Sequence, residues 1–276
     1  MLRSYLYVPG DKPELLAKAL LLRGMQRPDA ILLDLEDAVA VSQKAKALAL
    51  VAEATHAPST DCEAPALFVR VNSGDLGLGD LSAIVGPGLA GVCLPKASVS
   101  AIARAASVLS AMGSDVGIIA LVETASAVQQ LAEIAVGSHV IGMALGEADL
   151  GAELGIAQGS DHAFWPIRMQ VVVAAVAAGL NPPTGPVSTN FRDLETFRHS
   201  TIALRNAGFG ARSAIHPAQI PIINEAMRPS PAETAAAQEL VASFDAAVAA
   251  GQGVMIDDRG RMVDEAIARA ARRLLT

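Results

Sequence analysis

Charged and polar side chains follow several of the most apolar runs of this sequence. They are Asp34, Glu36, Asp37, Arg70, Asn72, Lys96, Glu123, Glu147, Asp149 and His216. Carboxylates predominate, and carboxylates in a cleft of low dielectric repel one another unless a cation lies between them. Oxygen donors without a His or Cys cluster favour Mg²⁺, with water and substrate completing its octahedral shell. If these side chains converge, we predict a Mg²⁺ site with Glu123 and Asp149 as direct ligands.

Several of these residues also have a structural explanation that the sequence leaves open. Glu123 and Asp149 could be carboxylates at the start of a helix, where the helix dipole stabilises them. Asp34 and Glu36 alternate with leucine, so they could face different sides, and at least one would then be structural. Arg70 is harder to explain in this way, because a charge inside an apolar strand needs a carboxylate partner from the protein or from a substrate.

Two further residues of this set are given no catalytic role. We interpret Lys96 as an ion-pair partner, which is the commoner use of a lysine at the end of a strand. His216 directly precedes Pro217, and we interpret it as a residue that caps a helix.

The elements that would position these residues are short apolar runs that alternate with segments of helical period. Strands are expected at Leu2–Val8, Ala30–Leu35, Leu67–Asn72, Gly91–Pro95, Val116–Val122, Val140–Gly146, Asn181–Val187 and Gly210–Ile215. Helices are expected to begin after Asp11 and after Ser230 as N-caps, and at Ala101–Met112, Ser126–Val136 and Trp165–Ala178. Runs that are apolar throughout are typical of parallel strands covered on both faces. The seventh strand is the weakest, because its prolines oppose regular pairing.

Eight strand–helix alternations predict an α/β fold, a (β/α)8 TIM barrel with a C-terminal helical lid arm. An open doubly wound sheet would need a G-x-G-x-x-G turn after an early strand, and the sequence has none there. We expect the barrel over residues 1–250 and the lid arm over residues 251–276, after the break at Gly251–Gly253. Active sites of such barrels lie at the carboxyl ends of the strands, where the charged residues above are found.

The overall composition narrows the class of protein. The chain has 276 residues, 52% of them hydrophobic, and a formal net charge of −7. An acidic chain is a poor candidate for binding nucleic acid or an anionic membrane. Two isolated cysteines, Cys62 and Cys93, indicate a reducing compartment rather than a disulfide framework. The N-terminus lacks the pattern of a signal peptide, and no apolar run reaches the roughly 20 residues of a spanning helix. We therefore expect a cytoplasmic protein.

The motifs at the strand ends resemble those of a known family. In chain order they are RSYLYVPG at 3–10, LDLEDAV at 33–39 with Lys44, VRVN at 69–72, LPK at 94–96, ETA at 123–125, GEAD at 146–149, AIHP at 214–217 with Gln219 and Ile220, and MVD at 262–264. Together they resemble the citrate lyase β-subunit-like (CitE-like) and malyl-CoA lyase group of the HpcH/HpaI aldolase superfamily.

This resemblance implies roles for the residues of the barrel. It implies that Glu123 and Asp149 are the Mg²⁺ ligands and that Arg70 clamps the carboxylate of an α-keto acid, which we expect it to hold bidentately. It also implies that Glu36 and Asp37 hold Arg70 and the metal-bound waters.

The resemblance further implies an oligomer and a coenzyme. An Asp of the lid reaches the active site of a neighbouring subunit as general acid/base in such relatives, and Asp264 matches it. The chain would then be a homo-oligomer, a trimer or hexamer. CoA phosphates would lie near the first strand–helix loop, with Lys12 as their contact and Arg3 and Arg23 as weaker candidates.

The chain departs from the family pattern at two places. Relatives often read Gly-Ala-Glu-Asp where this chain has Gly146-Glu147-Ala148-Asp149, so the Glu is displaced by one position. Relatives usually carry Asp in the seventh-strand segment, where this chain has Pro182-Pro183-Thr184. The second departure puts the substrate contacts at that rim in doubt.

The resemblance implies a Mg²⁺-dependent carbon–carbon lyase. Such an enzyme would cleave or form a malyl-, citramalyl- or citryl-CoA type of thioester, with an α-keto acid and an acyl-CoA as the other partners. One alternative is a CoA-independent aldolase acting on pyruvate or oxaloacetate. Another is the β-subunit of a multi-chain citrate lyase whose thioester sits on a carrier protein. A non-enzymatic metabolite-binding subunit is the remaining alternative.

Overall fold

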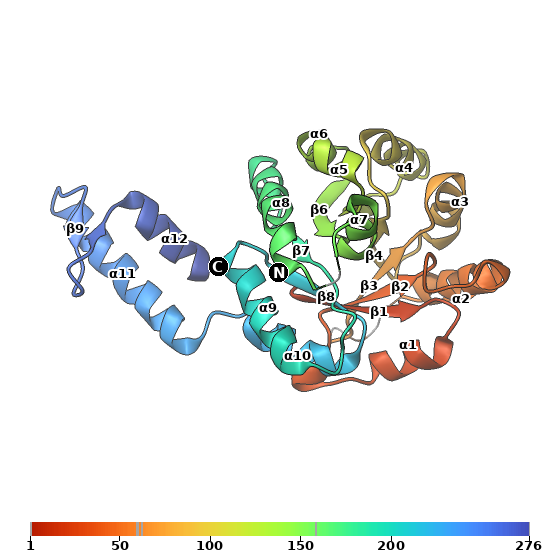
Figure 1. Ribbon diagram of the computed structural model, residues 1–276, viewed down its shortest axis with the longest axis horizontal. Helices are drawn as coiled ribbons and strands as arrows, with labels where there is room; N and C mark the ends of the chain where they lie inside the picture. The colour runs from red at the N-terminus through yellow and green to blue at the C-terminus, as the bar shows by residue number, and fades with distance from the viewer. Residues whose placement is uncertain (1, 59–60, 62, 158, 276) are drawn as a thin grey trace. The chain divides into compact units, whose positions relative to one another are not determined.

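The computed structural model describes residues 2–58, 61, 63–157 and 159–275 (Figure 1). Cys62 lies outside these residues. The chain forms two compact units, Met1–Met227 and Arg228–Thr276. This division falls earlier than the expected boundary at residue 250, so the long helix after Ser230 belongs to the second unit. No helix of the described chain is long and apolar enough to cross a membrane.

The first unit is a closed barrel of eight parallel strands, each paired with its neighbour in the chain and the last with the first. The strands are β1 (Ser4–Pro9), β2 (Ala30–Asp34), β3 (Ala66–Arg70), β4 (Leu89–Leu94), β5 (Gly117–Val122), β6 (Val140–Leu145), β7 (Thr184–Gly185) and β8 (Ala211–Ala214). This confirms the predicted fold class, and the strands overlap the eight apolar runs that predicted them.

Helices follow the strands and cover the outside of the barrel. They are α1 (Pro13–Leu20), α2 (Lys44–His56), α3 (Gly74–Ile84), α4 (Val99–Ala111), α5 (Ala125–Gln129), α6 (Leu131–Ala135), α7 (Glu147–Leu154), α8 (Trp165–Ala177), α9 (Leu194–Asn206) and α10 (Ile220–Ala226), with short 3-10 turns η1 (Gly24–Gln26), η2 (Val41–Gln43), η3 (Asp161–Phe164) and η4 (Pro217–Gln219). The single helix expected at Ser126–Val136 is two short helices that meet at Gln130.

Side chains of the strands alternate between two apolar layers, as the period of two in a β-strand requires. The larger layer lies between the strands and the surrounding helices. The smaller layer fills the inside of the barrel and includes Tyr5, Leu32, Phe68, Cys93 and Leu121. Cys93 is therefore a small core residue, as its apolar neighbours in the sequence predicted.

The seventh strand has only two residues, because the prolines around it cannot take part in a ladder. Arg212 of β8 compensates for the few backbone hydrogen bonds between β7 and its neighbouring strands. Its guanidinium donates to the carbonyl oxygens of Pro186 and Phe197 and to the hydroxyls of Ser200 and Thr201. The segment after β7 is thus fixed by a buried side chain where backbone pairing is short.

The second unit is a helical hairpin with a small β-ribbon. It contains α11 (Pro231–Ala249), β9 (Met255–Ile256), β10 (Met262–Val263) and α12 (Glu265–Leu275). The ribbon is antiparallel, and Phe244, Val263 and Ala268 form the buried core of the unit. Ser230 and Glu233 form the capping box that the sequence predicted for the start of α11.

Candidate active site

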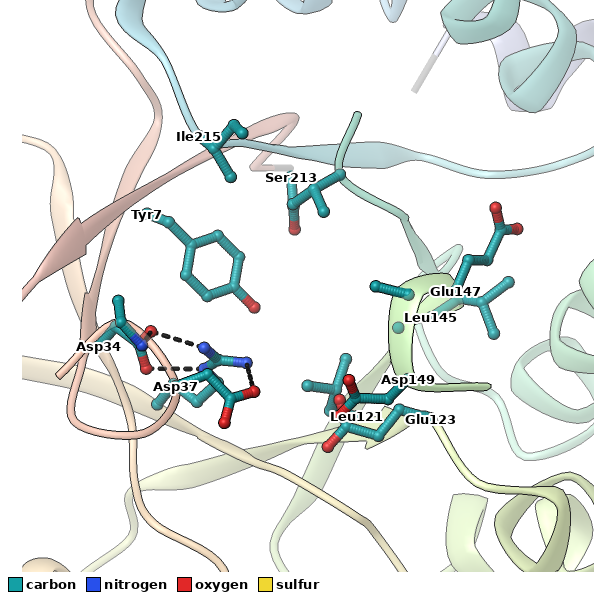
Figure 2. A pocket seen from close by; sticks show the side chains of 15 residues that line it. Tyr7, Asp34, Asp37, Leu121, Glu123, Leu145, Glu147, Asp149, Ser213 and Ile215 are labelled. Carbon is teal, nitrogen blue, oxygen red and sulfur yellow. Dashed lines mark hydrogen bonds and ion pairs between the residues drawn. The ribbon is translucent and has the colours of Figure 1, made fainter. Parts of the chain in front are cut away.

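A polar cavity lies at the carboxyl ends of the strands, next to the core inside the barrel, and inward-facing side chains of the strands line it. Two residues beyond the core residues Tyr5, Leu32, Phe68 and Leu121 stand Tyr7, Asp34, Arg70 and Glu123. A strand repeats its facing every second residue, so these four side chains continue the inner face at the carboxyl ends of their strands. They line a cavity of about 330 Å³, together with Asp37, Gly146, Glu147, Asp149, Val187, Ser213, Ile215 and their neighbours (Figure 2).

Arg70 is held chiefly by Asp34. The carboxylate of Asp34 accepts from Nε of Arg70 at 2.7 Å and from Nη2 at 2.5 Å, which is a bidentate pair. Asp34 is almost fully buried, and it also accepts the backbone N–H groups of Glu36 and Ala38. The bidentate edge of the guanidinium is therefore occupied by the protein. Asp34 occupies the edge formed by Nε and Nη2, so a substrate carboxylate held by Arg70 would be bound through Nη1, which faces away from Asp34.

Nη1 of Arg70 is directed toward two further carboxylates. It lies 3.1 Å from Oε2 of Glu36 and 3.9 Å from Oδ2 of Asp37. Glu36 is buried, and burial is the main cause that raises the pKa of its carboxyl group. The side chain of Asp37 is 62% exposed, so an anionic ligand can displace it more easily than Glu36. The structure thus brings Glu36 and Asp37 to Arg70, as predicted, but adds Asp34 as the principal partner.

Glu123 and Asp149 come from neighbouring strand ends and lie together on one wall of the cavity (Figure 2). Glu123 directly follows β5 and is buried, whereas Asp149 lies in the first turn of α7 and is 44% exposed. Burial, with Glu36 and Asp149 nearby, raises the pKa of Glu123 to about 7. A buried carboxylate near other carboxylates has this property, and a bound cation would relieve the repulsion.

These two carboxylates are the residues that could hold a metal ion. The described residues contain no group of three or more His, Cys, Asp or Glu side chains arranged to hold one. Mg²⁺ does not require such a group, since it commonly binds through one or two carboxylates and keeps several waters. The donor set of Glu123 and Asp149 therefore fits Mg²⁺ and does not fit a zinc site, which needs three or four protein ligands.

Gly146 lets Glu123 approach the end of β6. A Cβ atom at position 146 would lie 2.7 Å from Cβ of Glu123 and 2.9 Å from its Oε2. We predict that Gly146→Ala weakens divalent-cation binding by about tenfold or more, because Glu123 must move away from its present place. Titration calorimetry with Mg²⁺ measures this. Gly142→Ala on the same strand is the control, since its Cβ would meet nothing within 4 Å. Equal cation affinity in both variants would contradict the prediction.

The displaced Glu147 has a structural partner. Its carboxylate accepts from Nε of Arg168 at 2.6 Å and from Nη2 at 2.8 Å, and the same guanidinium binds Asp161. This pair joins the start of α7 to α8. Of the two acids in this motif, Glu147 is thus engaged by the protein while Asp149 stays accessible.

The basic residues suggested for CoA lie away from this cavity. Lys12 forms an ion pair with Asp11 at 3.0 Å and lines a separate cavity of about 300 Å³ between α1 and α2. Arg3 precedes β1, at the opposite end of the barrel from the cavity, and pairs with Asp29. Arg23 donates to carbonyl oxygens at the end of α1. Among these three, only Lys12 lies at the rim where the strands end.

His216, Lys96 and Asp264 have clear local roles. His216 caps the turn η4, and Lys96 forms the ion pairs expected of it. Asp264 belongs to the second unit, where its Oδ1 accepts the N–H of Ile267 at the start of α12. Its carboxylate therefore caps the N-terminus of α12.

Sequence reasoning missed Tyr7 and Ser213. The ring of Tyr7 lies 5.2 Å from the guanidinium of Arg70, and its hydroxyl points into the cavity (Figure 2). The signal was present in the alternation of the first strand, because Tyr7 shares a face with the core residue Tyr5. Ser213 carried no comparable signal, since a small polar residue in a short strand is common.

Known proteins resemble this chain both in sequence and in structure. The model of the HpcH/HpaI aldolase/citrate lyase family matches residues 3–217. A (3S)-malyl-CoA thioesterase of Cereibacter sphaeroides is 37% identical, over 99% of this chain and 93% of that protein. A citrate lyase subunit beta-like protein of Deinococcus radiodurans is 34% identical, over 100% and 97%. The crystal structure of CitE from Mycobacterium tuberculosis with magnesium, acetoacetate and coenzyme A has a TM-score of 0.80 and 30% identity, over 99% of this chain and 96% of that one. The chain belongs to the HpcH/HpaI aldolase/citrate lyase family.

Proposed function

We propose that this protein is a Mg²⁺-dependent lyase that cleaves or forms the carbon–carbon bond of a 2-hydroxyacyl-CoA thioester of the malyl, citramalyl or citryl type. The observation that carries the proposal is that Glu123, Asp149 and Arg70 line one cavity at the carboxyl ends of the barrel strands. Two carboxylates suit a hard divalent cation, and the guanidinium beside them suits the carboxylate of an α-keto acid. The magnesium, acetoacetate and coenzyme A in the similar CitE crystal structure support the same assignment.

Glu123 and Asp149 would hold Mg²⁺, with water and substrate as its other ligands. When bound, the ion supplies Lewis-acid stabilisation of negative charge on the oxygen beside the bond that breaks. Nη1 of Arg70 would bind the substrate carboxylate in place of Asp37, while Asp34 fixes the plane of the guanidinium. Leu121, Leu145 and Ile215 line the same cavity and limit the entry of water.

The coenzyme would extend beyond this cavity. A space of about 330 Å³ suits a small keto acid and the acyl end of a thioester rather than a whole CoA molecule. We propose that the phosphates lie along the rim toward Lys12, whose side chain is 49% exposed beside the second cavity.

We further propose that Asp264 exchanges the proton at the acyl carbon and reaches the site from a neighbouring subunit of a trimer or hexamer. Its place at the N-terminus of α12 in the second compact unit supports this role. Asp264→Asn should lose nearly all turnover while Mg²⁺ affinity stays within about twofold, because the charge that holds the ion is elsewhere.

A mixing experiment tests the role of the neighbouring subunit. Asp264→Asn and Glu123→Gln chains, each inactive alone, should regain part of the wild-type turnover after subunit exchange, because some sites then combine an intact barrel with an intact lid arm. No recovery, with exchange verified by native mass spectrometry, would show that Asp264 does not act across subunits.

Product analysis decides between bond cleavage and thioester hydrolysis. The protein is incubated with malyl-, citramalyl- and citryl-CoA and Mg²⁺, and the CoA species are separated by chromatography. A lyase releases acetyl-CoA together with glyoxylate, pyruvate or oxaloacetate. Free CoA with the intact hydroxy acid would replace the lyase proposal by hydrolysis. Turnover of the free hydroxy acids would favour a CoA-independent aldolase, and activity only on a carrier-protein thioester would favour a subunit of a multi-chain enzyme.

Thioester hydrolysis is the second candidate because a relative at 37% identity is named a (3S)-malyl-CoA thioesterase. Both reactions would use the same grip on the hydroxy-acid end of the substrate. They differ in whether a water molecule reaches the thioester carbonyl of the bound substrate.

A further inference from the structure

Lys96 adopts a backbone conformation that is unusual for its residue type. It follows β4 with a φ of 47°, in the left-handed region, and His139 is the only other non-glycine residue of the described chain with a positive φ. Residues other than glycine are held in this region only when their surroundings require it, and such positions cluster at functional sites. The conformation has a visible consequence, because it directs the main-chain N–H of Lys96 to Oε1 of Glu123 at 2.7 Å.

The side chain of Lys96 lies close to two carboxylates of the site. Its ammonium lies 3.0 Å from Oε1 of Glu36 and 3.7 Å from Oδ2 of Asp149. One residue thus contacts both proposed metal ligands, Glu123 through the main chain and Asp149 through the side chain, and the buried Glu36 as well. A lysine that served only as a rim ion pair would need neither the strained backbone nor the third carboxylate.

The charges around the cavity explain what this cation does. Acidic side chains outnumber basic ones around the cavity. The acidic ones are Asp34, Glu36, Asp37, Glu123 and Asp149, the basic ones are Arg70 and Lys96, and Arg70 is already paired with Asp34. Without the ammonium of Lys96, Asp149 would lose the positive charge that pairs with it, and Glu36 would keep only Arg70. The site would then carry more uncompensated negative charge, which would raise its affinity for a divalent cation.

We propose that Lys96 is a positioning residue that acts as a resident counter-cation of the metal site. Its ammonium holds Asp149 and Glu36 in place before the divalent cation arrives, competes with that cation for Asp149, and attracts the anionic substrate. This inference rests on the proposed Mg²⁺ site at Glu123 and Asp149. Competition between the ammonium and the divalent cation for Asp149 keeps the divalent cation exchangeable. The cation therefore binds most tightly when the keto acid is bound as well.

The proposal predicts opposite changes in the affinities for Mg²⁺ and for pyruvate. Lys96→Met should bind Mg²⁺ about three- to tenfold more tightly than the wild type, because the side chain is 43% exposed and its charge is partly screened. The same variant should bind pyruvate several-fold more weakly at saturating Mg²⁺. Both affinities are measured by calorimetry, with Mn²⁺ titration followed by electron paramagnetic resonance as a second readout.

Three further substitutions of Lys96 and one control at Lys18 separate the effect of the charge from that of the backbone conformation. Lys96→Arg should resemble the wild type because it keeps the charge. Lys96→Gly relieves the left-handed backbone and keeps the N–H to Glu123, so it should match Lys96→Met if the charge is responsible. Lys96→Gln keeps a donor and replaces Lys96→Met if that variant does not fold. Lys18→Met removes an exposed charge of α1 and should leave both affinities unchanged.

Unchanged or weaker Mg²⁺ binding by folded Lys96→Met or Lys96→Gln would overturn the inference and leave Lys96 a rim ion pair. A wild-type protein that binds neither Mg²⁺ nor Mn²⁺ would instead overturn the proposed function. The two failures are therefore distinguishable in the same titrations.

Discussion

Replacement of Glu123 by glutamine is expected to weaken Mg²⁺ binding by about 100-fold or more and to lower turnover by about 1,000-fold. Glutamine has nearly the same shape, so the N–H of Lys96 keeps an acceptor while the charge is lost. Glu123 is 3% exposed, which means that water cannot replace the missing charge at this wall of the cavity. The change therefore removes a ligand without creating a void.

Calorimetry and steady-state kinetics measure these two effects. The control is Glu133→Gln on the exposed face of α6, which removes the same charge away from the cavity. It should leave cation affinity and turnover near the wild-type values. Wild-type cation affinity in Glu123→Gln would exclude direct ligation by this carboxylate.

Replacement of Asp34 by alanine should lower the free energy of unfolding by about 3–5 kcal/mol, because it leaves the guanidinium of Arg70 without its bidentate partner. The change also removes the acceptor of the N–H groups of Glu36 and Ala38, which shape the loop after β2. Arg70 would then turn toward Glu36, so keto-acid affinity should fall together with stability. Urea unfolding and pyruvate titration measure the two effects.

The exposed pair of Asp75 and Arg104 provides the matched control. The side chain of Asp75 is 88% exposed, so Asp75→Ala should change the unfolding free energy by at most about 1 kcal/mol. A similarly small effect of Asp34→Ala would show that the pair with Arg70 is not important for stability. Lost stability with unchanged pyruvate affinity would show that Asp34 does not position Arg70 for the ligand.

The apolar side of the cavity leads to a further expectation about substrates. Arg70 is the only cationic side chain that lines the cavity in the described chain, and the apolar part of the lining includes Val187, Ile215 and Leu145. A second carboxylate would find Arg70 paired with Asp34 and Lys96 paired with Glu36 and Asp149, and it would add charge to an acidic site. Pyruvate should therefore bind more tightly than oxaloacetate at saturating Mg²⁺, by about tenfold, in calorimetric titrations. Equal affinities would contradict this.

The amino-acid sequence determined the fold class and most of the strand ends. Short apolar runs, several of them ending in or followed by a charged residue, are typical of parallel strands that are covered on both faces and end at a polar site. Because side chains two residues apart in a strand face the same side, Asp34 shares the inner face with Leu32, and Arg70 shares it with Phe68. These relations are local, so they could be read from the chain without knowing which strands are neighbours.

Tertiary structure decided which partner each charge has. Arg70 pairs through Nε and Nη2 with Asp34, and Glu147 pairs with Arg168, because those distant residues meet only when neighbouring elements pack. The left-handed turn at Lys96 likewise follows from the place of Glu123 on the next strand. Sequence supplied the charges and the strands that carry them, and packing of the closed barrel settled which charges neutralise one another and which remain for a ligand.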